Sequence, residues 1–166
     1  MTKDPVGEGT SILKGLSEEE IRRFLSIARA IRVPRGKVIL REGEDGDTMY
    51  LLREGMVEVS KTMVLQSGSE NSSRDKILSK LSAGDHAVFG EVALFEQSKR
   101  TATVIALTDC TLLEIHKKDF HRLAEEDPRL GYKITRNIAE LLCSRLRKTG
   151  EDMVKLTTAL SIALSR

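Results

Sequence analysis

Tryptophan is absent from the sequence, and aromatic residues make up only 4% of its 166 residues. The buried core must therefore be aliphatic, built from Leu, Ile and Val. Long apolar runs are also absent, because none approaches the roughly 18 residues of a membrane span. Residues 1–5 lack the apolar stretch of a secretory signal. These absences predict a soluble chain with no membrane association and a cytoplasmic location.

Cysteine is scarce and the charges nearly cancel. Cys110 and Cys143 are the two cysteines, so a disulfide is disfavoured and a four-cysteine iron–sulfur cluster is excluded. The 27 basic and 25 acidic residues leave a net charge of +2, which is too balanced to indicate nucleic-acid binding. The length suits one domain, or one domain with a helical extension.

Candidate metal ligands are few and scattered. The three histidines are His86, His116 and His121, and the last two would not share a helix face. A small β-barrel metalloenzyme is therefore the least favoured function. Residues 43–47 form a polar turn that reads either as a cation loop or as a tight connection between strands. The connection is favoured, because the ligand positions of an EF-hand are missing.

Short apolar runs separated by glycines begin at residue 31. This pattern predicts an all-β barrel or sandwich. The polar residues 66–75 predict a mobile hairpin loop. The expected strands are 31–33, 38–40, 48–52, 56–60, 77–81, 103–106 and 111–115.

Helices flank this region. Ser17 with Glu20 three residues later is a capping box, which predicts a helix start. A short helix over residues 119–124 should stop at Asp127, because Pro128 disfavours helical geometry in the preceding residue. Pro128 then suits the first turn of another helix.

The last helix carries apolar residues at near-heptad spacing from Leu130 to Leu164. This seam either pairs with a second copy of the chain or folds back on its own barrel, and dimerisation is favoured. Gly150 weakens a helix by about 1 kcal/mol relative to Ala, so we expect a kink or a break there.

The segment 84–104 carries the binding chemistry. Gly90 permits close approach of the backbone to a ligand, and residues 91–95 can form one helical turn whose N–H groups attract an anion. Arg100 offers the planar fork of donors that suits a phosphate. Glu91 could accept a hydrogen bond from a ribose hydroxyl. The alternative is a Glu91–Arg100 salt bridge that staples the loop.

The run Phe89-Gly90-Glu91-Val92-Ala93-Leu94, with Arg100-Thr101-Ala102-Thr103 at that spacing, resembles the phosphate-binding cassette of cyclic nucleotide-binding domains. Such domains occur in cyclic-nucleotide-dependent protein kinases, in nucleotide-gated channels and in the catabolite activator protein. The glycine pattern of 33–39, 42–50 and 55–59 is similar too, so the resemblance covers roughly residues 15–150.

The resemblance implies a mainly β fold, a double-stranded β-helix (jelly-roll barrel) with an N-terminal helix and long C-terminal helices. It divides the chain into a flexible N-terminus (1–14), a binding domain (15–127) and a lid or dimerisation helix (128–166).

The resemblance also assigns roles. Glu91 would take the ribose 2′-OH and Arg100 the exocyclic phosphate oxygen, with backbone N–H groups near Gly90, Ala93 and Thr101 completing the cradle. The phosphate and ribose side would comprise Phe89, Gly90, Glu91, Val92, Ala93, Arg100, Thr101 and Ala102, and the base and sugar side Val59, Leu78, Arg145 and Thr149.

Four positions leave alternatives open. Thr101 is compatible with cAMP and with cGMP, and family frequency favours cAMP. Arg145 could pair with Glu91 and Thr149 could reach the base, or both could belong to a solvated basic face. The chain is two residues longer than the family between Asp85 and Glu91, and His86 in that insertion reads as a ligand contact or, preferably, as an exposed loop residue.

The predicted function is a regulatory module that binds cAMP or cGMP, without catalysis and without a further cofactor. Ligand binding would change the C-terminal helix or a dimer surface, and a separate effector protein could read that change. The alternative is a relative or fragment of a catabolite-activator-type transcription regulator. Only about sixteen residues follow Gly150, too few for a DNA-binding domain, so DNA is not an expected partner.

Overall fold

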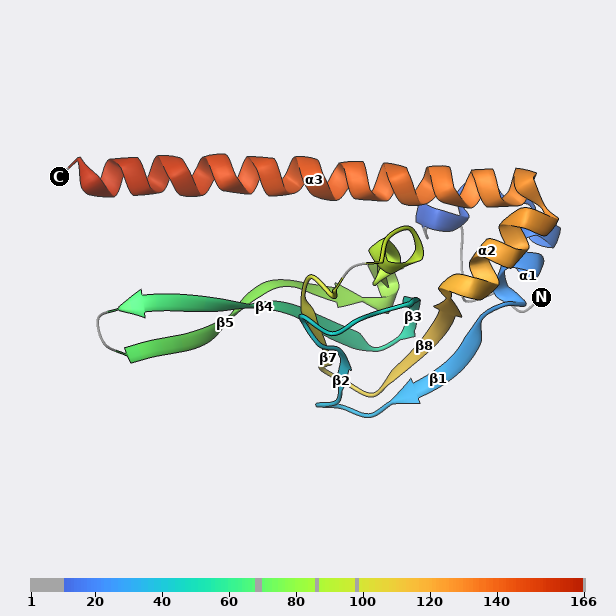
Figure 1. Cartoon of the computed structure of the whole chain (residues 1–166), viewed down its shortest axis with the longest axis horizontal. Coiled ribbons are helices and arrows are strands. Elements are labelled where there is room, and N and C mark those ends of the chain that lie inside the picture. The colour runs from blue at the N-terminus through green and yellow to red at the C-terminus, as the bar shows by residue number, and fades with distance from the viewer. Residues whose placement is uncertain (1–10, 68–69, 86, 98, 166) are drawn as a thin grey trace.

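A computed structural model describes residues 11–67, 70–85, 87–97 and 99–165. Eight strands form a barrel, and one long helix runs along its side (Figure 1). The strands are β1 (Arg29–Val33), β2 (Val38–Leu40), β3 (Thr48–Glu54), β4 (Met56–Ser67), β5 (Glu70–Ser82), β6 (Val88–Phe89), β7 (Thr103–Ala106) and β8 (Cys110–His116). The helices are α1 (Glu18–Leu25), α2 (Lys117–Glu126), α3 (Pro128–Leu164) and the short 3₁₀ turns η1 (Ser11–Leu13), η2 (Ala83–Asp85) and η3 (Glu91–Leu94).

The strands form two antiparallel four-stranded sheets, in the orders β1-β8-β3-β6 and β2-β7-β4-β5. The expected jelly-roll fold with flanking helices is therefore confirmed. All seven predicted strands are present. The sequence pattern missed β6, because two residues are too few to show a period.

Successive side chains of a strand point to opposite faces of the sheet, and this alternation divides the core into two clusters. On β3, Tyr50 and Leu52 point between the sheets, whereas Met49 and Leu51 point toward the helices. The outer cluster holds Phe24 of α1, Phe120 of α2 and Ile134 of α3. The core is mainly aliphatic, as the scarcity of aromatic residues predicted, although three of the four phenylalanines lie within it.

The predicted helix ends are confirmed. In the capping box, Ser17 N–H donates to Glu20 Oε2 at 2.7 Å and Glu20 N–H donates to Ser17 Oγ at 3.2 Å. α2 ends at Glu126, and α3 begins at Pro128 with its Leu130 N–H held by Asp127 Oδ1 at 3.0 Å. None of the helices in the described residues combines the length and apolar character that crossing a bilayer requires.

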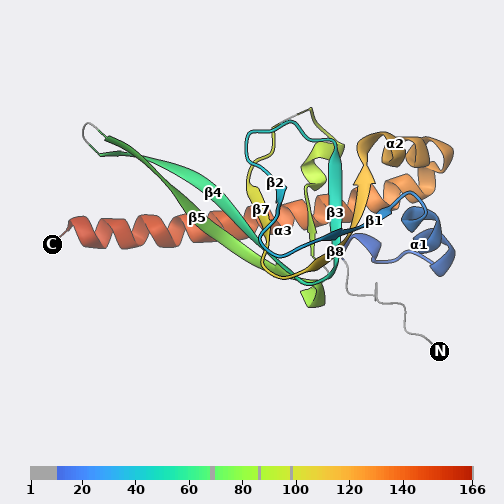
Figure 2. The same cartoon turned by 90° about the horizontal axis from the view of Figure 1, so that it is seen from below.

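α3 is continuous through Gly150, so the expected break is wrong. A glycine costs a helix only about 1 kcal/mol and keeps its N–H, so the hydrogen bonds of the turns on either side carry the helix across it. The N-terminal half of α3 buries Leu130, Ile134 and Ile138, while its C-terminal half extends past the barrel (Figures 1 and 2).

The polar segment 66–75 is not the long loop that its composition predicted. β4 and β5 pair from Met56↔Ser82 out to Ser67↔Glu70, and residues 68–69 lie outside the described residues. The ladder hydrogen bonds are made by the backbone, so polar side chains do not prevent pairing. The β4–β5 hairpin leaves the barrel at the same end of the molecule as the C-terminus of α3 (Figures 1 and 2).

The packed part of the chain starts before residue 15. Residues 1–10 of the expected flexible N-terminus lie outside the described residues, but Ile12 and Leu13 are buried. Nδ2 of Asn137 on α3 donates to the carbonyls of Ile12 at 2.9 Å and Lys14 at 2.8 Å. Two apolar side chains and this amide clamp therefore order η1 against α3.

Candidate functional site

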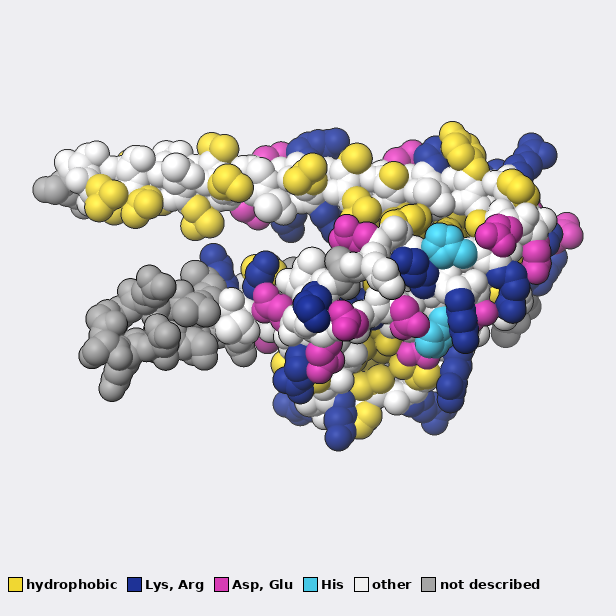
Figure 3. Space-filling model, viewed as in Figure 1, with side chains coloured by type: hydrophobic (Ala, Val, Ile, Leu, Met, Phe, Trp, Pro, Cys, Tyr) yellow, Lys and Arg dark blue, Asp and Glu magenta, His cyan; other side chains and the backbone are white. Residues whose placement is uncertain are grey.

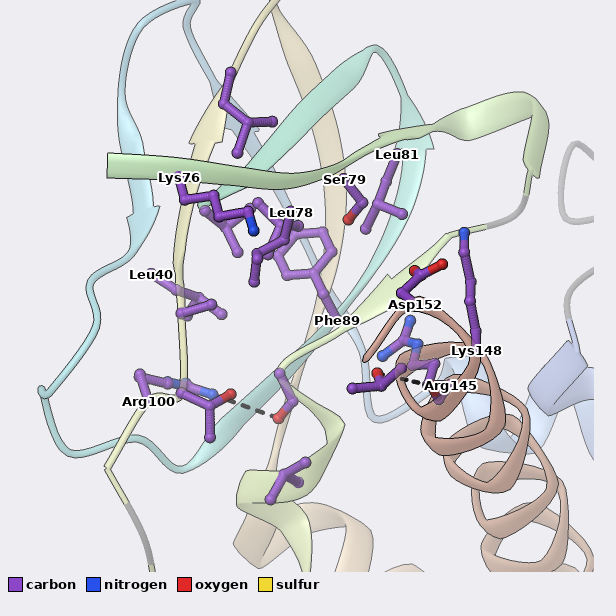
Figure 4. Close-up of a pocket in the computed structure, with 18 of the residues that line it drawn as sticks. Leu40, Lys76, Leu78, Ser79, Leu81, Phe89, Arg100, Arg145, Lys148 and Asp152 are labelled. Carbon is purple, nitrogen blue, oxygen red and sulfur yellow. Dashed lines mark hydrogen bonds between the residues drawn. The ribbon is translucent and has the colours of Figure 1, made fainter. Parts of the chain in front are cut away.

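A cavity of about 1090 Å³ lies between the barrel and α3. In Figure 4, Lys76, Leu78 and Leu81 enter it from β5, while Lys148 and Asp152 enter from α3. Six basic and two acidic residues line it, so the electrostatic potential in the cavity favours an anionic ligand. Its lining includes every residue that the sequence singled out for binding: Val59, Leu78, Phe89, Gly90, Glu91, Val92, Ala93, Arg100, Thr101, Ala102, Arg145 and Thr149.

Gly90 sits where only glycine fits. Its φ is +76°, a left-handed conformation that other residues rarely adopt. A Cβ there would lie 2.9 Å from the carbonyl oxygen of Thr48 and 3.0 Å from Nη1 of Arg100. The backbone turn at Gly90 thus brings η3, the single helical turn expected after it, beside Arg100 and the start of β3. The N–H of Ala93 already donates to the Gly90 carbonyl at 3.2 Å.

The Glu91 carboxylate is buried, with 3% of the residue exposed. Its Oε1 accepts a hydrogen bond from Nη1 of Arg145 at 2.5 Å, and Nη2 of Arg145 donates to the carbonyl of Val88. Oε2 of Glu91 is also buried and has no hydrogen-bond donor among the described residues. An unsatisfied buried acceptor costs about 1–3 kcal/mol, so this oxygen is ready to accept a ligand hydroxyl.

Arg100 does not form the salt bridge with Glu91 that the sequence left open. Its Nη1 donates to the carbonyls of Thr48 at 2.8 Å and Gly90 at 3.4 Å, and its Nη2 donates to Oγ1 of Thr48 at 2.8 Å. Burial lowers the pKa of the Arg100 guanidinium, but arginine remains protonated in proteins. The fork is thus a fixed cation in the cavity wall.

Gly46 shapes the candidate site by making room for Arg100, and sequence reasoning missed it. A Cβ on Gly46 would lie 2.0 Å from Nε of Arg100, so the arginine side chain needs the space that this glycine leaves. The 43–47 turn is a strand connection, as the sequence favoured: Arg100 N–H donates to the Glu44 carbonyl at 2.8 Å, and Asp45 pairs with Lys99 at 3.3 Å. The spacing of residues in the sequence gives no signal for the contact between Gly46 and Arg100, because the two residues are far apart in the chain.

The C-terminal part of α3 covers the cavity. Arg145 pairs with Glu91, as the sequence had suggested for a lid helix, and Thr149 lies one turn further on with its hydroxyl donating to the Arg145 carbonyl at 3.0 Å. Lys148 and Asp152 also line the cavity (Figure 4), although the sequence did not single them out. Their signal was helical spacing, because Lys148 follows Arg145 by three residues and Asp152 follows Thr149 by three residues.

His116 and His121 do not line the cavity. His121 contacts the Leu94 carbonyl at 2.8 Å, His116 lies beside Glu114, and His86 is outside the described residues. No three His, Cys, Asp or Glu side chains among the described residues come together as a metal site requires. Cys110 is buried, Cys143 is exposed, and both are free thiols.

Comparison with known proteins identifies the same region. Residues 30–127 match the family described as the cyclic nucleotide-binding domain. The chain is 37% identical over 135 residues to Glutaminase 1 of Bradyrhizobium diazoefficiens, which covers 81% of this chain and 20% of that protein. It is 29% identical over 146 residues to the cyclic AMP receptor protein of Thermus thermophilus, which covers 88% of this chain and 62% of the relative.

The fold is similar to the crystal structure of Thermus thermophilus catabolite activator protein. The TM-score is 0.75 at 27% identity, over 89% of this chain and 63% of the other. The chain therefore spans less than two thirds of the length of each of these relatives. The likeness covers both the barrel and much of the helix that closes the cavity.

Proposed function

The chain belongs to the cyclic nucleotide-binding domain family, and from this premise we propose that its cavity binds a purine cyclic nucleotide, preferably cAMP, as a regulatory signal. The proposal rests on a fixed cation that lies close to a buried hydrogen-bond acceptor. Arg100 holds its fork beside Gly90, and Oε2 of Glu91, in the adjoining turn, has no donor among the described residues. A cyclic phosphate and a ribose hydroxyl supply the two complementary groups.

The phosphate binds at Arg100, with backbone N–H groups near Gly90, Ala93 and Thr101. Because the Ala93 N–H donates to the Gly90 carbonyl at 3.2 Å, it shares or gives up that bond when the phosphate enters. The ribose 2′-OH donates to Glu91. Val59, Leu78 and Phe89 form the apolar wall against which the sugar and base pack.

The base lies toward α3. Thr149 uses its proton on the helix backbone, so its oxygen lone pairs remain available to the exocyclic amino group of adenine. Thr101 lines the same cavity and is compatible with either purine. The preference for cAMP rests on family frequency and on the similarity to the cyclic AMP receptor protein of Thermus thermophilus.

Ligand binding changes the position of α3. Arg145 joins the helix to Glu91, and a ribose hydroxyl that binds the same carboxylate alters that contact. The helix presents a large apolar surface beyond the barrel (Figure 3), so a shift of α3 changes a surface that a second copy would bury. Its exposed apolar residues are Leu146, Met153, Val154, Leu156, Leu160, Ile162 and Leu164.

Titration calorimetry with cAMP, cGMP and 5′-AMP tests the ligand. 5′-AMP keeps the adenine and ribose but lacks the cyclic phosphate, so it is the matched control. We expect saturable binding of cAMP, weaker binding of cGMP and no comparable binding of 5′-AMP. Failure of both cyclic nucleotides to bind, or equal binding of 5′-AMP, contradicts the proposal.

Analytical ultracentrifugation tests the dimer. We expect a dimer that Leu146→Asp converts to a monomer, because Leu146 belongs to the near-heptad seam and a carboxylate cannot be buried there unpaired. A monomeric wild-type protein, with and without cAMP, rules out dimerisation through α3.

A further inference from the structure

A row of polar side chains leads from Arg100 into the sheet that contains β3. Nη2 of Arg100 donates to Oγ1 of Thr48 at 2.8 Å. The Thr48 hydroxyl donates to the Tyr50 hydroxyl at 3.1 Å, which donates to Oε1 of Glu114 at 3.0 Å. Oε2 of Glu114 lies 3.4 Å from Nε2 of His116. We call Thr48, Tyr50 and Glu114 the hydroxyl row.

The strand register builds this row. Tyr50 on β3 lies opposite Phe89 on β6 and opposite Glu114 on β8. Thr48 lies two residues before Tyr50 and therefore points to the same face. The row thus starts at Arg100 in the cavity wall and ends at Glu114 on β8, beside His116, whose side chain is 36% exposed.

Hydrogen bonds along the row run in one direction only. Arginine can only donate hydrogen bonds, and an ionised glutamate can only accept them. Each hydroxyl between them therefore accepts one hydrogen bond and donates another in the direction of Glu114. Burial raises the pKa of Tyr50, so its hydroxyl keeps the proton that it donates. Glu114 therefore fixes the Tyr50 proton, which in turn orients the Thr48 lone pair toward Arg100.

Because the row is buried, the sequence of donors and acceptors along it is fixed. Thr48 and Tyr50 are only 6% and 7% exposed, so bulk water cannot readily replace a missing partner. Removing one member leaves a buried hydroxyl unsatisfied, and the side chains then rearrange to satisfy it. Such a rearrangement would change the hydrogen bond between Thr48 and the Arg100 guanidinium.

We propose that Tyr50 and Glu114 are positioning residues for Arg100, which they hold through the Thr48 hydroxyl in the orientation that receives the phosphate. The consequence for affinity rests on the proposed function, whereas the orientation of Arg100 in the ligand-free protein does not. The Tyr50 ring also stacks on Phe89, with centroids 5.4 Å apart, and Tyr50→Phe preserves that contact while removing the hydroxyl.

NMR of the ¹⁵N-labelled, ligand-free protein tests the orientation. In the wild type, the guanidinium N–H signals of Arg100, assigned with Arg100→Lys, should be resolved because the fork is held at both nitrogens. Tyr50→Phe and Glu114→Leu should broaden or merge them. Glu114→Gln should retain them, because its amide oxygen still accepts from Tyr50.

Thr111→Val is the matched control. It removes another side-chain hydrogen bond between β8 and β3, from Thr111 to Glu54 at 2.6 Å, away from Arg100. A loss of stability alone would affect this control as well. Unchanged Arg100 signals in both Tyr50→Phe and Glu114→Leu overturn the proposal, whether or not a ligand is known.

Calorimetry with cAMP provides the second readout. Tyr50→Phe should weaken binding about three- to tenfold, the usual effect of one hydrogen bond, and should have no further effect in an Arg100→Ala background. Equal effects in both backgrounds mean that Tyr50 acts independently of Arg100 and overturn the proposal. If the wild type binds no cyclic nucleotide, the proposed function fails, and the NMR result alone decides the role of the row.

Discussion

Nη1 of Arg145 lies 2.5 Å from Oε1 of Glu91, and this contact joins helix α3 to the short turn η3 in the cavity wall. The two residues come from elements far apart in the chain, and the contact exists because α3 packs its N-terminal half on the core. One end of this pair is buried and the other is partly exposed. The pair therefore links helix α3 directly to a buried carboxylate that lines the cavity.

Loss of this pair should destabilise the ligand-free protein. Arg145→Ala leaves the buried Glu91 carboxylate without its cation, and breaking a fully buried pair costs about 3–5 kcal/mol. Because 39% of the Arg145 side chain is exposed, water recovers part of this, and we expect about 1–3 kcal/mol in urea unfolding. Arg145→Lys should be intermediate, because lysine cannot reproduce the two-pronged contact with Glu91 and Val88.

Arg136→Ala is the control for Arg145→Ala. Arg136 lies on the same helix and pairs with Glu140 at 3.6 Å, and both side chains are exposed. Its removal should change stability by at most about 0.5 kcal/mol. Equal unfolding free energies for the two alanine variants would show that the Glu91 pair does not hold α3.

Replacement of Arg100 tests the phosphate site. Arg100→Ala leaves a bound phosphate without its cation, so binding should weaken by about 2–5 kcal/mol. That is about 30- to several-thousand-fold in the dissociation constant measured by calorimetry. Arg122→Ala, at an exposed arginine on α2, should bind as the wild type does. Near-normal cAMP binding by Arg100→Ala would remove Arg100 from the site.

Gly46→Ala should impair binding more than folding. The new Cβ would lie 2.0 Å from Nε of Arg100, and this flexible side chain can move away while the barrel stays intact. We expect a native circular dichroism spectrum and about five- to hundredfold weaker cAMP binding, because the charged hydrogen bonds of Arg100 are lost. Gly84→Ala is the control, since its Cβ would meet only Ser82 Oγ at 3.5 Å. Equal affinity of the two variants refutes the contact.

Stability should fall in acid partly through Glu20. The hydrogen bond from Lys133, at 2.6 Å, and the backbone N–H of Ser17 lower the pKa of Glu20 below its usual 4.5. This contribution is present above about pH 4.5 and is lost as the pH falls through the lower, folded-state pKa. Chemical unfolding of Glu20→Gln at several pH values should show a shallower loss below pH 4.5. A slope identical to that of the wild type would exclude this role.

Local patterns in the sequence were enough to predict the elements of the fold. Alternation interrupted by glycines indicated seven strands, and the capping box at Ser17 and the proline at 128 marked two helix starts. These signals succeed because they depend on backbone preferences and on the period of neighbouring side chains. The cassette from Gly90 to Arg100 was visible for the same reason, since its glycine, carboxylate and arginine lie in one short segment.

Local patterns misled where many weak backbone interactions act together. The polar composition of 66–75 predicted a loop, but antiparallel pairing continues through it because the ladder bonds come from the backbone. Gly150 predicted a break, but its cost of about 1 kcal/mol is too small to interrupt a helix supported on both sides.

The sequence by itself determined which groups the candidate site offers: an arginine and a carboxylate in one short segment, with a long helix that carries apolar residues to follow. Only the tertiary structure decided how these groups are held. Arg145 reaches Glu91, Thr48 and Gly46 shape the space for Arg100, and Tyr50 connects Arg100 to Glu114. These contacts join residues about fifty or more positions apart, so they depend on strand register and helix packing rather than on any local preference of the chain.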